Sequence, residues 1–321
     1  MQVQTEITYT EMTAKKKISC FVSLWKNIKK NYILYLMILP VVAYYIIFAY
    51  VPMYGIQIAF KDFIPKLGFM GSPWVGFEHF LRFLNSYNFK NLLLNTLEIS
   101  VYGLVAGFPI PIIFALLLNY LPGKWFRKSI QMVSYAPHFI STVVMCGMIT
   151  IFLAPNTGII NQIIAVFGGS SVSFLSVPEY FKSIYVWSGI WQGMGFSSII
   201  YISALSGVDY QLHEAAIIDG ATKFQRIIHI DIPSIAPTMI ILLILSLGSI
   251  MGVGFEKVYL LQNSLNMSSS DVIATYVYRV GLIDSDYSYS TAIGLFNSVI
   301  NAGLLVVVNS IAKKFSSTSL W

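Results

Sequence analysis

Charged residues are scarce in this sequence: they make up 11% of its 321 residues, against roughly 25% in a soluble globular protein. Hydrophobic residues make up 56%, and the mean hydropathy is +0.70. This deficit of charge excludes a water-soluble all-α protein, because too few polar residues remain to cover the apolar runs. Cysteine is scarce as well. Cys20 lies in a basic N-terminal stretch and Cys146 in an apolar segment, so we expect neither a disulfide nor a metal site.

Sequence motifs of nucleotide and catalytic sites are missing. There is no G-x-x-x-x-G-K-[ST] phosphate loop, since Gly123-Lys124 is followed by Trp125 and lacks the upstream glycine. There is also no H-E-x-x-H zinc motif and no G-x-S-x-G nucleophile motif. We therefore expect no catalytic residue, no metal and no cofactor in this chain.

Long apolar runs are what the sequence has instead. About 20 consecutive apolar residues span a bilayer, and six segments meet this requirement. We predict an all-α polytopic membrane protein with spans near 32–50, 92–118, 139–153, 184–205, 235–260 and 291–311. The third span is short, and a start nearer Ser129 stays open. This organisation comprises a basic tail at 1–31, a transmembrane domain at 32–312 and a C-terminal tail at 313–321.

Glycine and proline positions indicate how the spans pack. Prolines within spans predict helix kinks; they are Pro40, Pro109 and Pro111. Three pairs of glycines four residues apart predict close approach of helix backbones; they are Gly103/Gly107, Gly189/Gly193 and Gly248/Gly252.

The basic residues indicate how the chain is oriented. Thirteen lysines and arginines lie before the first span, between spans 2 and 3, between spans 4 and 5, and after span 6. Six lie in the alternate loops. Because cytoplasmic loops carry the excess of lysine and arginine, we predict that both termini and the loop at about 209–234 are cytoplasmic.

This loop contains EAAIIDGATKFQRIIHIDIP at residues 214–233. Asp209 can cap a helix over 210–218, and Gly220 suits the left-handed position after it. The run from Thr222 to Gln225 fits a capping box that opens a second helix, which we expect to end before Pro233. The pattern leaves two readings open, a surface that binds a protein partner and an amphipathic helix that lies on lipid.

The loop resembles the EAA motif of permease subunits of ATP-binding-cassette importers. That motif reads E-A-A, three residues, G, nine residues, I-x-L-P, and the chain departs from it only in Ile232 for leucine. The resemblance implies a maltose-permease-like fold whose loop seats in an ATPase subunit. The residues that would couple to the ATPase are Glu214, Ala215, Ala216, Asp219, Gly220, Phe224, Ile230 and Pro233.

The resemblance extends along most of the chain. Segments such as VPMYGIQIAFKDF (51–63), YAPHFIS (135–141) and DVIATYVYRVGL (271–282) are similar to permeases that import oligosaccharides from complex polysaccharides, including pectin-derived uronides. The resemblance implies a bacterial cytoplasmic membrane protein and a homologous second permease. It also implies an ATPase dimer that binds ATP and Mg²⁺, and an extracellular or periplasmic sugar-binding protein. No nucleic-acid partner is expected.

Residues of the sugar pathway are predicted from chemistry, because sugars present apolar ring faces and hydroxyl edges. The candidates are Glu98, Trp187, Trp191, Gln192, Tyr201, Glu256, Lys257, Asn297 and Asn301. For Trp187, a place in the interfacial aromatic belt stays an alternative. An ion-coupled secondary transporter of small solutes is the alternative function. It would use ionisable residues within the membrane, of which Glu98 is the clearest.

Overall fold

The computed structural model describes residues 27–315. Within this range the ordered elements are helices, accompanied by one isolated antiparallel bridge between Lys61 and Trp74, so the all-α prediction is confirmed there. Cys20 and most of the predicted tails lie outside the described residues. The chain divides into two compact units, 1–57 and 58–321, and each is described by itself.

The described part of the first unit, residues 27–57, is mostly helical and apolar. Its elements are α2 (Tyr32–Tyr45), the π turn η1 (Ile46–Tyr50), α3 (Val51–Met53) and the start of the 3₁₀ helix η2 (Tyr54–Phe60). No residue of α2 is buried, and Pro40 lies inside it. The stretch Tyr32–Phe60 is long and apolar enough to cross a membrane, which agrees with the first predicted span.

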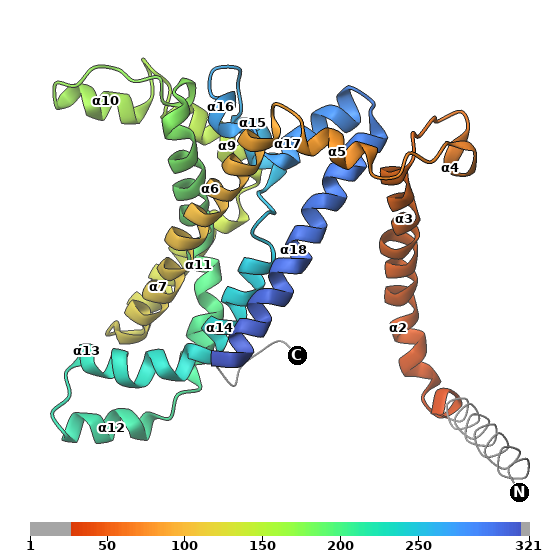
Figure 1. Cartoon of the computed structure of the whole chain (residues 1–321). Coiled ribbons are helices and arrows are strands. Elements are labelled where there is room, and N and C mark those ends of the chain that lie inside the picture. The colour runs from red at the N-terminus through yellow and green to blue at the C-terminus, as the bar shows by residue number, and fades with distance from the viewer. Residues whose placement is uncertain (1–26, 316–321) are drawn as a thin grey trace, which may run out of the picture. The chain divides into compact units, whose positions relative to one another are not determined.

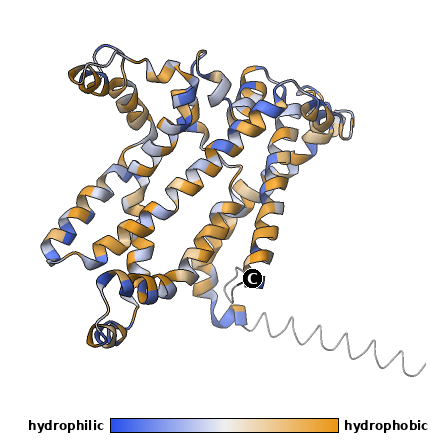
Figure 2. Cartoon of the chain, turned by 60° about the vertical axis from the view of Figure 1, so that its left-hand side comes forward, coloured by the Kyte–Doolittle hydropathy of each residue, from blue (hydrophilic) through white to orange (hydrophobic). Residues whose placement is uncertain are grey.

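Long helices run between the two ends of the second unit (Figure 1). They are α6 (Phe89–Gly107), α7 (Pro109–Tyr120), α11 (Pro178–Ser206), α14 (Ile232–Gly248) and α18 (Tyr287–Phe315). Hydrophobic residues make up much of the sequence of these helices, as the colouring by hydropathy in Figure 2 shows. Helices α6 and α7 pack on α11, and Gly107 lies beside Ile190 of α11: an added Cβ would be 3.6 Å from that side chain, an ordinary van der Waals distance.

Shorter elements close the ends of this unit. At one end lie α12 (Tyr210–Ile218), α13 (Lys223–Arg226) and the π turn η5 (Ile227–Asp231). The remaining elements are α4 (Gly68–Gly71), α5 (Glu78–Leu84), α8 (Lys124–Tyr135), η3 (Ala136–Phe139), α9 (Thr142–Phe152), α10 (Ile159–Val166), η4 (Phe174–Ser176), α15 (Phe255–Leu261), α16 (Met267–Ser270), α17 (Ile273–Tyr278) and η6 (Arg279–Ile283).

Four helical stretches among the described residues are long and apolar enough to span a membrane; they are Tyr32–Phe60, Phe89–Tyr120, Lys223–Gly248 and Tyr287–Lys314. A fifth is the pair Lys124–Phe139 and Thr142–Phe152, which is bent by 99°. This pair corresponds to the third predicted span. Helix α11 has 29 residues, which is about 44 Å of helix, but its polar residues keep it below this hydropathy. Six spans therefore stay a prediction.

The fifth predicted span is shorter than the sequence suggested. Helix α14 ends at Gly248, and residues 249–254 are not helical. Side chains of two other helices bind backbone N–H groups of this non-helical segment. Asn301 Oδ1 of α18 accepts a hydrogen bond from Met251 N at 3.0 Å, and Tyr185 Oη of α11 accepts one from Gly254 N at 3.2 Å. Irregular backbone is tolerated at membrane depth when protein groups satisfy it.

Cysteine labelling in intact cells tests the predicted orientation. Ser170 lies in the segment between α10 and η4, and Ser206 lies at the end of α11 next to α12. We expect a membrane-impermeant thiol reagent to label Ser170→Cys and to spare Ser206→Cys until the cells are opened, in a background in which Cys20 and Cys146 are replaced. If Ser206→Cys is labelled in intact cells and Ser170→Cys is not, the predicted orientation is wrong.

Candidate functional site

The loop between α11 and α14 projects from one end of the second unit (Figure 1). Its helix α12 begins at Asp209, whose carboxylate accepts a hydrogen bond from the backbone N–H of Gln211 at 3.0 Å. The helix is followed by Gly220, whose φ of +79° is the left-handed conformation that favours glycine. The predicted bounds, cap and terminating glycine of this helix are confirmed.

The second helix of the loop begins as predicted but does not end as predicted. Thr222 and Gln225 form the reciprocal capping box that opens α13. The expected end before Pro233 is wrong, because the wide turn η5 leads directly into α14. Pro233 lies in the first turn of α14, where a missing backbone N–H costs little.

The surface of this loop is largely exposed. Ile218 is 86% exposed and Phe224 is 70% exposed. Phe224 is one of the predicted coupling residues. Of the remaining seven, Glu214, Ala215, Asp219, Gly220 and Pro233 are exposed, and Ala216 and Ile230 are half-buried. A helix that lies on lipid carries lysine and arginine on its polar face. Helix α12 has neither residue and carries Glu214 next to its apolar side chains, so its composition favours a protein partner over lipid.

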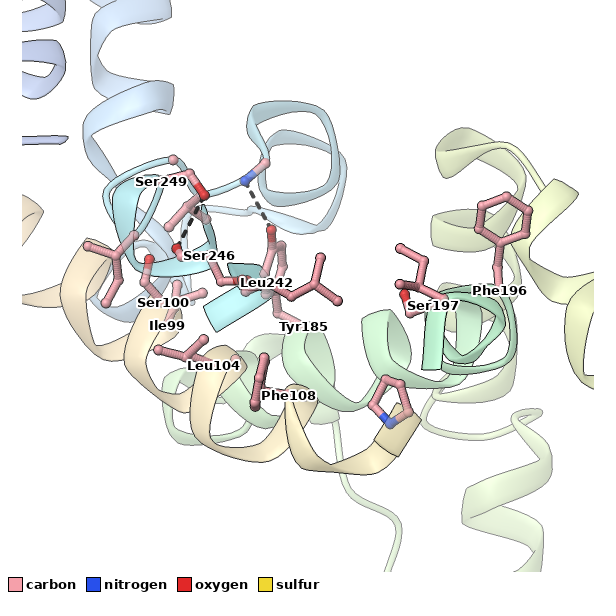
Figure 3. A pocket seen from close by; sticks show the side chains of 18 of the residues that line it. Ile99, Ser100, Leu104, Phe108, Tyr185, Phe196, Ser197, Leu242, Ser246 and Ser249 are labelled. Atoms are coloured by element: carbon pink, nitrogen blue, oxygen red, sulfur yellow. Dashed lines mark hydrogen bonds between the residues drawn. The ribbon is translucent and has the colours of Figure 1, made fainter. Parts of the chain in front are cut away.

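A cavity of about 730 Å³ lies among α6, α7, α11, α14 and the break that follows α14 (Figure 3). Apolar side chains such as Leu104 and Phe108 form much of its wall, and serines interrupt them. These polar positions are Ser100, Ser197, Ser246 and Ser249. Tyr185 lines the cavity and accepts the hydrogen bond from Gly254 N. Such a wall, apolar with scattered hydroxyls, suits an amphipathic ligand.

A second cavity of about 340 Å³ shares Tyr185 and Ser197 with the first and contains Lys257 and Gln192. Lys257 Nζ donates to the backbone oxygen of Tyr185 at 2.8 Å and lies 4.8 Å from the centre of its ring. Gly189 makes room for the ammonium group, since a Cβ there would lie 3.2 Å from Nζ. Among the described residues, no carboxylate lies within 4 Å of this cation.

The other predicted pathway residues on α6 and α11 are dispersed. Glu98 on α6 forms an ion pair with Lys182 on α11, so its carboxylate already has a partner within the chain. Trp187 donates from Nε1 to the hydroxyl of Tyr102 at 2.7 Å. Gln192 donates to the backbone oxygen of Ile140 at 2.8 Å. Trp191 lines a separate small cavity against α8.

The remaining pathway candidates fall into two groups. Tyr201 is buried and lines the larger cavity, and Glu256 is exposed beside Lys257. Asn297 and Asn301 instead contact the break after α14. Asn297 Nδ2 donates to the backbone oxygen of Met251 at 3.5 Å, and Asn301 Oδ1 accepts a hydrogen bond from the backbone N–H of the same residue. Neither asparagine lines the two cavities described above, so the predicted set does not converge on a single pocket.

Sequence reasoning missed the break after α14 and, with it, Ser246 just before the break and Ser249 within it as wall residues of the larger cavity. The signal was present as three glycines within seven residues, Gly248, Gly252 and Gly254, which weaken a helix. The predicted packing role holds at Gly248, where a Cβ would collide with Leu305 of α18. It is wrong at Gly252, which lies in the break.

Comparison with known sequences identifies relatives over nearly the whole chain. The family model described as the binding-protein-dependent transport system inner membrane component matches residues 107–317. Protein LplB of Bacillus subtilis (strain 168) is 44% identical over 310 residues, which are 97% of this chain and 96% of that protein. The polygalacturonan/rhamnogalacturonan transport system permease protein YteP of the same strain is 43% identical over 92% of each chain.

Solved structures match the fold as well. A bacterial ABC transporter involved in the import of the acidic polysaccharide alginate contains a chain that is 41% identical. The TM-score is 0.85, over 91% of this chain and 98% of that one. A bacterial alginate ABC transporter in complex with an alginate pentasaccharide-bound periplasmic protein matches with 40% identity and a TM-score of 0.86, over 92% and 99% of the two chains.

Proposed function

Because the chain belongs to the family of inner membrane components of binding-protein-dependent transport systems, we propose that it forms half of the translocation pathway of an ATP-binding-cassette importer for oligosaccharides. It is a multi-pass protein of the bacterial inner membrane and a transport subunit, not an enzyme. The partners we propose are a homologous second permease, an ATPase dimer and a sugar-binding protein. The transporter solved with its periplasmic protein supports the last of these.

The observation that carries this proposal is the projecting loop at 209–234. It presents Glu214 and Ala215 on a capped helix, beside apolar side chains that are exposed, such as Ile218. A water-exposed, acidic and apolar surface of this kind fits a groove of another protein. We propose that α12 is the coupling helix and that its groove belongs to the ATPase, which also binds ATP and Mg²⁺.

The substrates we propose are acidic oligosaccharides derived from polysaccharides. The names of the relatives point to polygalacturonan, rhamnogalacturonan and alginate, each of which carries carboxylates. Lys257 lies at the wall of a cavity, and no carboxylate of residues 27–315 forms an ion pair with it. Sugar rings would lie on its apolar wall and a uronate carboxylate would meet Lys257, because charge-assisted hydrogen bonds are the stronger ones.

Transport by reconstituted vesicles tests this function. The vesicles contain this chain, the second permease and the ATPase, and face the binding protein loaded with an oligogalacturonate or an alginate oligosaccharide. We expect uptake only when ATP is supplied on the ATPase side. Uptake driven by an imposed proton or sodium gradient without ATP would contradict the proposal and support the ion-coupled alternative.

A further inference from the structure

A buried carboxylate joins the coupling loop to the transmembrane helices. Asp231 ends the π turn η5, just before α14, and its side chain is 0% exposed. The hydroxyl of Tyr120, the last residue of α7, donates to Asp231 Oδ2 at 2.7 Å. The EAA motif as written above leaves position 231 open, so the motif assigns no role to Asp231.

The second oxygen of Asp231 faces the coupling helix. His213 is the buried residue of α12, and its Nε2 lies 3.4 Å from Asp231 Oδ1. No residue among 27–315 donates a hydrogen bond to Oδ1, although a buried polar atom is costly to leave unpaired. A small shift of α12 would complete this contact. The carboxylate therefore favours positions of α12 that bring His213 closer.

Further contacts enclose the same group. The ring of Tyr120 meets that of His213 edge to face, with centroids 6.5 Å apart. The guanidinium of Arg226 lies 5.5 Å from the centre of the Tyr120 ring, and its Nε is buried and has no hydrogen-bond partner among the described residues. Helix α12 and the turn η5, which belong to the same loop, thus meet the end of α7, whose Tyr120 is 111 residues from Asp231 in the sequence.

Helix α7 leads from this cluster to the larger cavity. Tyr120 is at one end of α7, and Pro111 near the other end lines the cavity together with Phe108, which precedes the helix. The helix also packs along α11 and α14 in a core that includes Ile112, Ala115 and Ile235. Because a short packed helix moves as a rigid body, a displacement of its Tyr120 end is carried to the cavity wall.

We infer that Asp231 is a positioning residue that couples α12 to α7, so that movement of the coupling helix reaches the wall of the sugar pathway. The inference rests on the proposed function, because it assumes that α12 responds to an ATPase. Asp231 itself need not touch either sugar or nucleotide.

Three substitutions that preserve size test this inference in the full transporter; they are Asp231→Asn, Tyr120→Phe and His213→Phe. We expect basal ATP hydrolysis to persist, while the stimulation by loaded binding protein falls about five-fold or more. Tyr289→Phe is the matched control, because Tyr289 is buried in a different core cluster that contains Phe83 and Ile293. It should lose stability to a similar extent and keep the stimulation.

Amide hydrogen exchange of α12 in the purified chain provides a second readout that does not depend on the ATPase. We expect faster exchange across 210–218 in the three variants and not in Tyr289→Phe. If wild-type vesicles show no ATP-driven uptake, the proposed function fails while this measurement still tests the contact. If the Asp231→Asn chain does not assemble into the transporter, the Tyr120→Phe and His213→Phe variants test the inference in its place. Stimulation and exchange equal to wild type, or equal to the control, would overturn the inference.

Discussion

Replacement of Gly220 by leucine is expected to lower sugar-stimulated ATP hydrolysis by about ten-fold or more, while the chain still inserts and assembles. Gly220 has a φ of +79°, and a residue with a Cβ is strained there by roughly 1–2 kcal/mol. Helix α12, which precedes Gly220, is held to the rest of the protein by few buried side chains, because His213 is its one buried residue. We therefore expect the strain to unwind the last turn of α12 and displace Ile218 from the ATPase. Phosphate release by the reconstituted transporter, with and without loaded binding protein, measures the effect.

Gly123 offers a matched control. Its φ is +83°, and like Gly220 it has no atom within 4 Å of an added Cβ, but it precedes α8 and lies outside the coupling loop. Gly123→Leu should carry a similar strain and leave the stimulation within about two-fold of wild type. Glu214→Lys reverses an exposed charge on α12 and should reproduce the loss seen with Gly220→Leu. Full stimulation in both loop variants would contradict the proposal that this loop contacts the ATPase.

Replacement of Lys257 by glutamine is expected to reduce uptake of an acidic oligosaccharide by about ten-fold, because a hydrogen bond to a charged group contributes about 1.5–3 kcal/mol. The ammonium group lies at a cavity wall without a carboxylate partner among the described residues. It is therefore available to a substrate carboxylate. Initial uptake of an oligogalacturonate into ATP-loaded vesicles is the measurement.

The comparison substrate is the same oligogalacturonate with its carboxylates methyl-esterified, which keeps the length and removes the charge. Its uptake should change by less than about two-fold in Lys257→Gln. Lys90→Gln removes an exposed lysine at the start of α6 and serves as the charge-matched variant. Equal losses for the acidic and the esterified sugar would show that Lys257 shapes the cavity without selecting charge.

The coupling loop was predictable in detail because its signals are local. A cap at Asp209, a left-handed position at Gly220 and a capping box from Thr222 to Gln225 each depend on residues within one or two helical turns. The end of the second helix was not predictable from Pro233 alone. A proline is tolerated in the first turn of a helix, and the π turn before it depends on how α14 packs in the core.

The cavities were less predictable, because they depend on which helices become neighbours. The predicted aromatic and amide residues are real features of α11 and α18, yet Trp191 faces α8 and Asn301 supports the backbone of Met251. Ser246 lies in the last turn of α14 and Ser249 in the break that follows it, and both line the larger cavity because α14 ends at Gly248 beside α6 and α11. An apolar sequence does not reveal such a break, because distant side chains satisfy the freed backbone groups.

The sequence by itself determined that the protein is helical and lies in a membrane, since apolar length and scarce charge depend on composition alone. It also determined the capped loop, whose hydrogen bonds close over short separations. Only the tertiary structure decided that Lys257 faces a cavity and has no carboxylate partner in the part of the chain that the structure describes, and that Asp231 contacts both α7 and α12. Tyr120 and Asp231 are 111 residues apart in the chain. A contact over that separation forms only when helix packing brings both ends together, so no local pattern encodes it.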